Sequence, residues 1–87
     1  MYYLYIVRCA DKTLYTGIAQ DVKKRVAEHN MSDVGAKYTR ARRPVKLVYT
    51  RRFRSRSTAS RAEARVKQLS RPAKLAMIKI AKRRSLQ

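Results

Sequence analysis

The side chains with the clearest capacity for chemistry are two tyrosines, an arginine, a histidine and a late glutamate: Tyr5, Tyr15, Arg25, His29 and Glu63. A phenol or an imidazole can take or relay a proton, and a planar guanidinium can bind two oxygens of one phosphate. A carboxylate can help to hold a divalent cation. Each of these residues also has an ordinary structural interpretation, so a site exists only if the fold brings them to one patch.

Two strands and a turn are the elements expected to hold the tyrosines. Residues 2–8 are rich in β-branched and aromatic side chains, which predicts a strand. After a polar turn at residues 10–13, residues 14–18 predict an antiparallel strand that carries Tyr15. Gly17 in this second strand leaves room for the close approach of a ligand or of another backbone.

A helix is predicted over residues 21–30, with Asp21 as its N-cap. Its valines share one face, which we expect to pack on the hairpin. Arg25 and His29 are four residues apart, so they lie together at the rim of that face. The helix would therefore hold both side chains beside the hairpin.

The remaining sequence predicts one further strand and two helices within a single domain over residues 1–87. The fold class is α/β (α+β), with a three-stranded antiparallel sheet flanked by helices. We expect the structured part to cover residues 2–82 and residues 83–87 to form a basic tail. The elements expected after residue 30 are a loop over residues 31–44, a strand from Val45 toward Phe53, a helix from Ser57 or Thr58 to Leu69, and a helix with Ser70 as its cap and Pro72 in its first turn.

The charge balance points to a polyanionic partner. The chain has 23 Lys and Arg residues against 5 Asp and Glu residues, a formal net charge of +18, which favours nucleic acid. An anionic membrane surface is the competing interpretation, although only the C-terminal helix could supply the amphipathic face that it needs. No apolar run approaches the ~20 residues of a membrane span, and no signal peptide is recognisable. We expect a cytoplasmic, nucleoid-associated protein with no obligate protein partner and no membrane association.

The basic residues are concentrated in the middle of the chain. Residues 34–62 carry ten Lys and Arg residues and no acid, which favours a surface that follows phosphates. Tyr38, interleaved with them, could stack on an unpaired base, whereas core packing is the favoured role of Phe53. Glu63 is the only acid among 18 Lys and Arg residues from Val34 to Gln87. The basic substrate-binding candidates are Lys37, Arg40, Arg42 and Arg43.

The ordered set of these residues resembles the GIY-YIG nuclease superfamily. The short, basic form is similar to the small stand-alone UPF0213-type members of that superfamily. The segments Glu28-His29-Asn30, Gly35–Arg40 and Arg43-Pro44 are also similar to the nuclease domain of endonucleases that cut branched DNA. The main resemblance rests on Tyr3-Leu4-Tyr5, on Tyr15-Thr16-Gly17, on Arg25 and His29 in one helix, and on the lone Glu63 in a later helix.

The resemblance implies hydrolysis of phosphodiester bonds with one divalent cation, Mg²⁺ or Mn²⁺. In this interpretation Arg25 stabilises the charge that develops on the phosphate, and Glu63 binds the cation. Tyr5 takes or relays the proton of the attacking water, with His29 or Tyr15 assisting, and a positive field would favour its phenolate. Further substrate contacts are expected from Thr16, Gly17 and Asn30.

Structural alternatives stay open for each of these residues. Glu63 could pair with a basic neighbour such as Arg65 or Lys67. Tyr5 and Tyr15 could form a cross-strand aromatic pair that stabilises the hairpin. His29 could be a surface histidine at the C-terminus of its helix, where the helix dipole favours a cation.

The function predicted from the sequence is that of a metal-dependent DNA endonuclease acting on single-stranded or branched DNA, in DNA repair or recombination. Two alternatives come from other classes of protein. One is a non-catalytic basic module that binds DNA or RNA. The other is a basic structural protein, for instance one associated with the ribosome.

Overall fold

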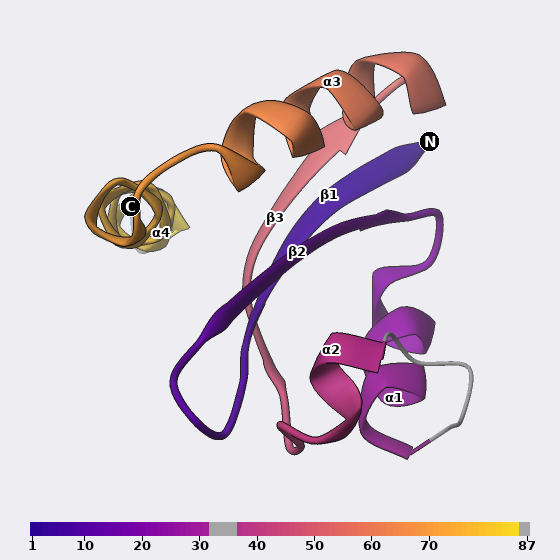
Figure 1. Cartoon of the computed structure of the whole chain (residues 1–87). Coiled ribbons are helices and arrows are strands. Elements are labelled where there is room, and N and C mark those ends of the chain that lie inside the picture. Colours follow the sequence, from indigo (N-terminus) through magenta and orange to yellow (C-terminus); the bar gives the residue numbers. More distant parts are fainter. Residues whose placement is uncertain (32–36, 86–87) are drawn as a thin grey trace.

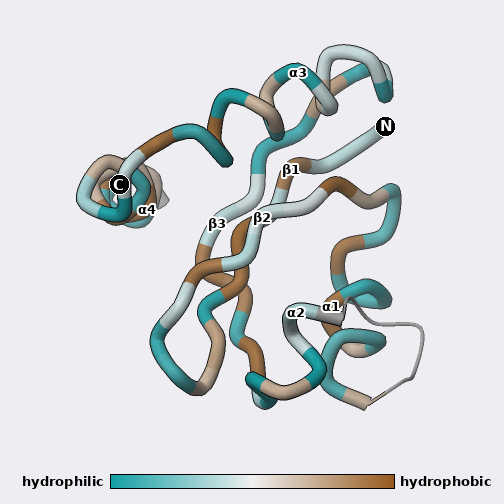
Figure 2. Tube along the Cα trace, viewed as in Figure 1, coloured by the Kyte–Doolittle hydropathy of each residue, from teal (hydrophilic) through white to brown (hydrophobic). Residues whose placement is uncertain are grey.

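A three-stranded antiparallel sheet forms the centre of the computed structural model, which describes residues 1–31 and 37–85 (Figure 1). β1 (Tyr2–Arg8) lies between β2 (Leu14–Ala19) and β3 (Lys46–Phe53). The middle of β1, residues 4–7, is at most 2% exposed, because helices cover both faces of the sheet. The trace has strongly hydrophobic stretches in this strand, whereas the two helices nearest the C-terminus show hydrophilic and hydrophobic colours in turn (Figure 2). The predicted hairpin and third strand are confirmed.

The register of β1 and β2 decides which side chains share a face. Tyr5 pairs with Gly17, and Ile6 pairs with Thr16. Paired residues lie on the same face of a sheet, and the faces alternate along each strand. Tyr5, Tyr15 and Gly17 therefore lie on one face, and Thr16 lies on the other.

Each face of the sheet is covered by one pair of helices (Figure 1). On the Tyr5 face lie α1 (Val22–Met31) and α2 (Lys37–Arg40), where Val22 and Val26 pack against the cluster that contains Tyr5. On the opposite face lie α3 (Arg56–Lys67) and α4 (Arg71–Ser85). Ala62 and Val66 of α3 join Leu4 and Ile6 in that second core. The predicted packing of the α1 valines on the hairpin is confirmed.

Side-chain caps begin three of the helices. The Asp21 carboxylate accepts a hydrogen bond from the backbone N–H of Lys24 at 3.1 Å, as predicted for α1. The Ser70 hydroxyl accepts one from the N–H of Ala73 at 3.3 Å, as predicted for α4. The prediction of Ser57 or Thr58 as the cap of α3 is wrong. Ser55 has the extended backbone of a cap and accepts from the N–H of Thr58, so α3 begins at Arg56.

Three local features differ from the sequence prediction. The expected loop contains the one-turn helix α2, which is too short to show a periodic pattern. A bulge in the pairing of β3 with β1 interrupts the alternation, so Val48 and Tyr49 both pack against the Ile6 cluster. The helix α4 continues to Ser85, past the expected boundary at Lys82. Its last turn carries three basic residues, which the helix dipole favours.

No helix within the described ranges is both long enough and apolar enough to cross a membrane.

Candidate active site

Gly17 is the position at which the Tyr5 ring crosses β2. A Cβ atom at Gly17 would lie 2.6 Å from the Tyr5 hydroxyl and 2.7 Å from the ring carbon that bears it. Glycine is therefore required for the phenol to lie against the edge strand, and Tyr5 is only 1% exposed. The prediction of a close approach at Gly17 holds, but the neighbour is this phenol and not a ligand or another backbone.

A chain of buried hydrogen bonds runs from Tyr5 through His29 to Thr39. The Tyr5 hydroxyl lies 2.8 Å from His29 Nε2, and His29 Nδ1 lies 2.7 Å from the Thr39 hydroxyl. His29 and Thr39 are both fully buried. The interpretation of His29 as a surface histidine is therefore wrong, because α1 turns its last-turn imidazole into the sheet.

Burial sets the protonation of this cluster. It lowers the pKa of His29, and the positive charges of Arg25 and Arg43 lower it further against the opposing effect of Glu28. Burial also raises the pKa of the Tyr5 phenol, although a hydrogen bond from Arg25 acts in the opposite direction. Desolvation outweighs the positive field in the chain without a metal ion, so the expected phenolate stays a prediction for the metal-bound site. The resting cluster holds a neutral phenol and a neutral imidazole.

The imidazole of His29 should stay neutral at a pH that half-protonates an exposed histidine, about 6.5. It is the only histidine, so its ring signals in an NMR titration are unambiguous. Below about pH 6.5 the His29 imidazole binds a proton in the unfolded chain but stays neutral in the folded chain. The free energy of unfolding should therefore fall as the pH drops through that value. Its slope is at most about 1.4 kcal/mol per pH unit. A measured pKa at or above 6.5 would contradict the burial argument.

Thr39 is a site residue that the sequence prediction missed. It lies in the one-turn helix α2, ten residues after His29, and the only signal for it was its place between two basic-segment candidates, Tyr38 and Arg40. Its hydroxyl is the hydrogen-bond partner of His29 Nδ1, so it fixes which nitrogen faces Tyr5.

Replacing Thr39 with valine should destabilise the fold by about 1–3 kcal/mol, because the isosteric side chain leaves His29 Nδ1 buried without its partner. Thr39→Ser keeps the hydroxyl and should retain most of the stability. Urea unfolding of the two variants and the wild type makes the comparison. Equal losses in both variants would mean that the methyl group, and not the hydrogen bond, is what matters.

A stack of rings extends outward from His29. The ring of Tyr15 meets His29 edge-on at 5.3 Å and stacks on Tyr38 at 5.8 Å. The Arg42 guanidinium lies 4.1 Å above the Tyr38 ring and forms an ion pair with Asp11 in the hairpin turn at 3.0 Å. Tyr38 thus has a ring partner and a guanidinium partner within the chain, yet it is 39% exposed, and its stacking on an unpaired base stays a prediction. The stack anchors the segment after α2 to the hairpin.

Several predicted substrate contacts have structural partners instead. The Asn30 amide donates to the carbonyl of Val45 at 3.0 Å and accepts from its N–H at 2.6 Å, which ties α1 to β3. Arg43 donates to the backbone carbonyl of His29. Thr16 is buried on the face opposite Tyr5, so it cannot reach a phosphate beside the phenols. Arg40 is exposed, and the side chain of Lys37 lies outside the described residues.

Arg25 and Glu63 complete the candidate set from two different helices. Arg25 lies close enough to Tyr5 to lower the pKa of the phenol against the effect of burial, and it forms an ion pair with Glu28 at 3.3 Å, with about 29% of its side chain exposed. Glu63 belongs to α3, which covers the opposite face, and its carboxylate lies 3.4 Å from Lys67 Nζ. After the dominant effect of burial, the charge of Glu63 also contributes to the raised pKa of Tyr5. The charge of Glu63 therefore acts on the phenol, although its helix covers the other face of the sheet and the five residues do not share one face.

The chain is similar to several known proteins. The profile of the GIY-YIG catalytic domain matches residues 1–76. A UPF0213 protein of Desulfotalea psychrophila is 50% identical over 82 residues, which cover 94% of this chain and 74% of the relative. One from Streptococcus agalactiae is 56% identical over 77 residues, covering 88% and 86%. The solution NMR structure of a UPF0213 protein from Bacillus halodurans has a TM-score of 0.59 and 44% identity, and covers 92% of this chain and 85% of its own.

Proposed function

Because this chain belongs to the GIY-YIG nuclease family, we propose that it is a metal-dependent endonuclease that hydrolyses phosphodiester bonds in single-stranded or branched DNA. The observation that carries the proposal is the buried hydrogen-bond chain from Thr39 through His29 to Tyr5, which ends beside the Arg25 guanidinium. A hairpin that needed only aromatic packing would have no use for a buried, neutral imidazole on its tyrosine.

The proton of the attacking water would leave through Tyr5. A buried phenol with a raised pKa is a poor base by itself, but it can pass its own proton to His29 Nε2 as it accepts the proton of the water. His29 can accept because burial keeps it neutral. The direct hydrogen bond favours His29 over Tyr15 as the assisting group, since Tyr15 meets His29 only through its ring.

Arg25 would bind the phosphate and stabilise the charge that develops on it. The ion pair with Glu28 already restrains the guanidinium, so less side-chain freedom is lost when a phosphate binds. Its partial exposure leaves part of the group open to a ligand.

Glu63 fits the requirements of a single magnesium or manganese ion. No group of three or more His, Cys, Asp or Glu side chains occurs among the described residues, which fits an ion that takes one protein carboxylate and completes its shell with water and substrate phosphate. The competing Lys67 is more than half exposed, so the ion pair that must open is weak. A bound cation would supply positive charge for the phosphate and the leaving oxygen.

A non-catalytic nucleic-acid-binding module is the second candidate function. The Lys67–Glu63 ion pair favours it, because it gives the carboxylate a structural role without any metal. In that case the net charge of +18 would serve binding alone, and RNA would be as suitable a ligand as DNA.

A cleavage assay distinguishes these functions. Labelled single-stranded, linear duplex and forked DNA of the same sequence are incubated with the protein in Mg²⁺, in Mn²⁺ and in excess chelator, beside a matched single-stranded RNA. We expect metal-dependent scission of the single-stranded or forked DNA. Tight binding without scission of any substrate in either metal would support the binding module and contradict the nuclease.

A further inference from the structure

The edge of the sheet formed by β3 carries three adjoining open cavities, of about 650, 460 and 410 Å³. Two of them lie between β3 and α4, and the third lies where β3 runs into α3. They share lining residues along β3, with Tyr49 and Thr50 common to the first two and Arg51 common to the last two. We call this continuous depression the β3 groove.

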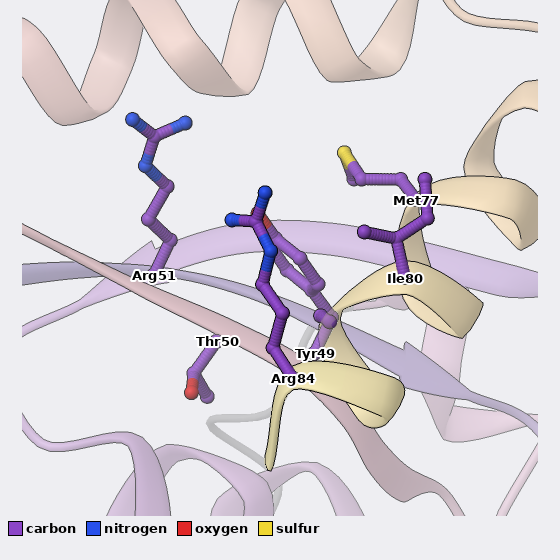
Figure 3. A pocket seen from close by; sticks show the side chains of 7 residues that line it. Tyr49, Thr50, Arg51, Met77, Ile80 and Arg84 are labelled. Atoms are coloured by element: carbon purple, nitrogen blue, oxygen red, sulfur yellow. The ribbon is translucent and has the colours of Figure 1, made fainter. Parts of the chain in front are cut away.

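The walls of the β3 groove are strongly basic. Figure 3 shows Arg51 of β3 and Arg84 of α4 extending in the same direction over the groove, with Met77 and Ile80 on the α4 side. Arg54, Arg61 and Arg65 line its α3 end, and all five of these arginines are exposed. No acid occurs among the lining residues that the structure describes.

The aromatic rings in the groove are engaged elsewhere. Phe53 packs against the core and lies 5.3 Å below the Arg51 guanidinium, and Tyr49 also packs against the core. The groove therefore offers charges rather than open ring faces, which suits the phosphates of a duplex better than the bases of an unpaired strand. An apolar protein segment would bury these guanidiniums without counter-charges, at a high cost.

The groove and the Tyr5–His29 part of the candidate active site lie at opposite edges of the sheet, whereas Glu63 belongs to α3, the helix that closes one end of the groove. The site lies where Tyr5 crosses β2, one edge strand, and the groove follows β3, the other edge strand. We propose that the β3 groove binds the backbone of a duplex arm of the nucleic acid while a different segment of the same substrate is cut beside Tyr5. This inference rests on the proposed function, because the second segment belongs to the substrate.

The test compares two triple variants that remove the same charge. The groove variant is Arg51→Gln/Arg65→Gln/Arg84→Gln, and the control variant replaces three exposed basic residues that line no part of the groove: Lys23→Gln/Arg71→Gln/Lys79→Gln. Both carry Glu63→Gln so that no substrate is cut during the measurement. Binding of a forked DNA and of a single-stranded DNA is titrated from low to high salt, and urea unfolding verifies that both variants fold.

The groove variant should bind the forked DNA ~100-fold more weakly near 0.1 M salt, with a salt slope reduced by about 2 to 3, because each duplex phosphate contact contributes about 0.9 to that slope. The control variant should change the slope far less, and the single-stranded DNA should lose less affinity than the fork. If both variants lose the same affinity for the forked DNA, the attraction depends only on net charge and the proposal is overturned. Equal losses of affinity for the forked and the single-stranded DNA would overturn it as well. If the wild type cleaves no DNA, the proposed nuclease function is contradicted, but the binding comparison still shows whether the β3 groove binds a duplex arm.

Discussion

Replacing Glu63 with glutamine should reduce single-turnover cleavage of a forked DNA by about 10³-fold or more. The neutral amide lacks the charge of the carboxylate and should bind a divalent cation much more weakly. Metal stabilisation of a phosphoryl transition state is worth several kcal/mol, and each 1.36 kcal/mol equals a factor of ten in rate. Rates are measured with excess protein over labelled DNA, so that binding does not limit the comparison. Glu63 is 23% exposed at its side chain, and the substitution should leave the fold intact.

Lys67→Gln is the matched control for this experiment. Lys67 is the ion-pair partner of Glu63, so a purely structural role predicts that both substitutions have the same effect. If Glu63 binds the metal ion, Lys67→Gln should not reduce cleavage. Removing the lysine frees the carboxylate for the metal, so cleavage should persist or increase. Equal loss of cleavage in Glu63→Gln and Lys67→Gln would contradict the metal role and would mean that Glu63 acts only through its ion pair with Lys67.

Gly17→Ala should destabilise the fold by about 1–3 kcal/mol, the usual cost of overpacking, and should also impair cleavage. The added Cβ would lie 2.6 Å from the Tyr5 hydroxyl, and the buried ring can move only by giving up its hydrogen bond to His29. No described glycine has a positive φ, so an alanine here would otherwise stabilise the protein through the unfolded state. The sign of the change in the free energy of unfolding therefore tests the contact.

A double-mutant cycle isolates the contact between Gly17 and Tyr5. In a Tyr5→Leu background the phenol is gone, so Gly17→Ala should cost little or even stabilise. Urea unfolding of the four proteins in the cycle measures the coupling free energy. An equal cost of Gly17→Ala in both backgrounds would mean that something other than the phenol requires the glycine.

The local parts of the fold could be predicted because local sequence determines them. Alternating apolar residues, a capping aspartate and a serine before a proline gave the strands, α1 and α4, and the structure confirms them. Ser55 was missed because Ser57 and Thr58 are equally good caps by type, and only the backbone conformation distinguishes them. The bulge near Val48 was missed because an extra residue leaves no compositional signal.

The partners of the polar side chains could not be predicted, because tertiary contacts determine them. A surface position was the structural alternative for His29, but a threonine ten residues later and a tyrosine 24 residues earlier contact both ring nitrogens in the interior. Asn30 was expected to meet substrate, yet the backbone of Val45 uses both ends of its amide. Thr16 was grouped with Tyr15 and Gly17 by motif, although the alternation of a strand turns it to the other face.

Glu63 and the Tyr5–His29 cluster must serve one site, although Glu63 comes from a helix on the face of the sheet opposite the cluster. Paramagnetic broadening by Mn²⁺ tests this directly, because even fractional occupancy broadens nearby NMR signals. In the wild type, Mn²⁺ should selectively broaden the imidazole signals of His29 and the amide signal of Gly17, and Glu63→Gln should abolish the effect. Broadening that spares these signals, or that persists undiminished after Glu63→Gln, would contradict the account.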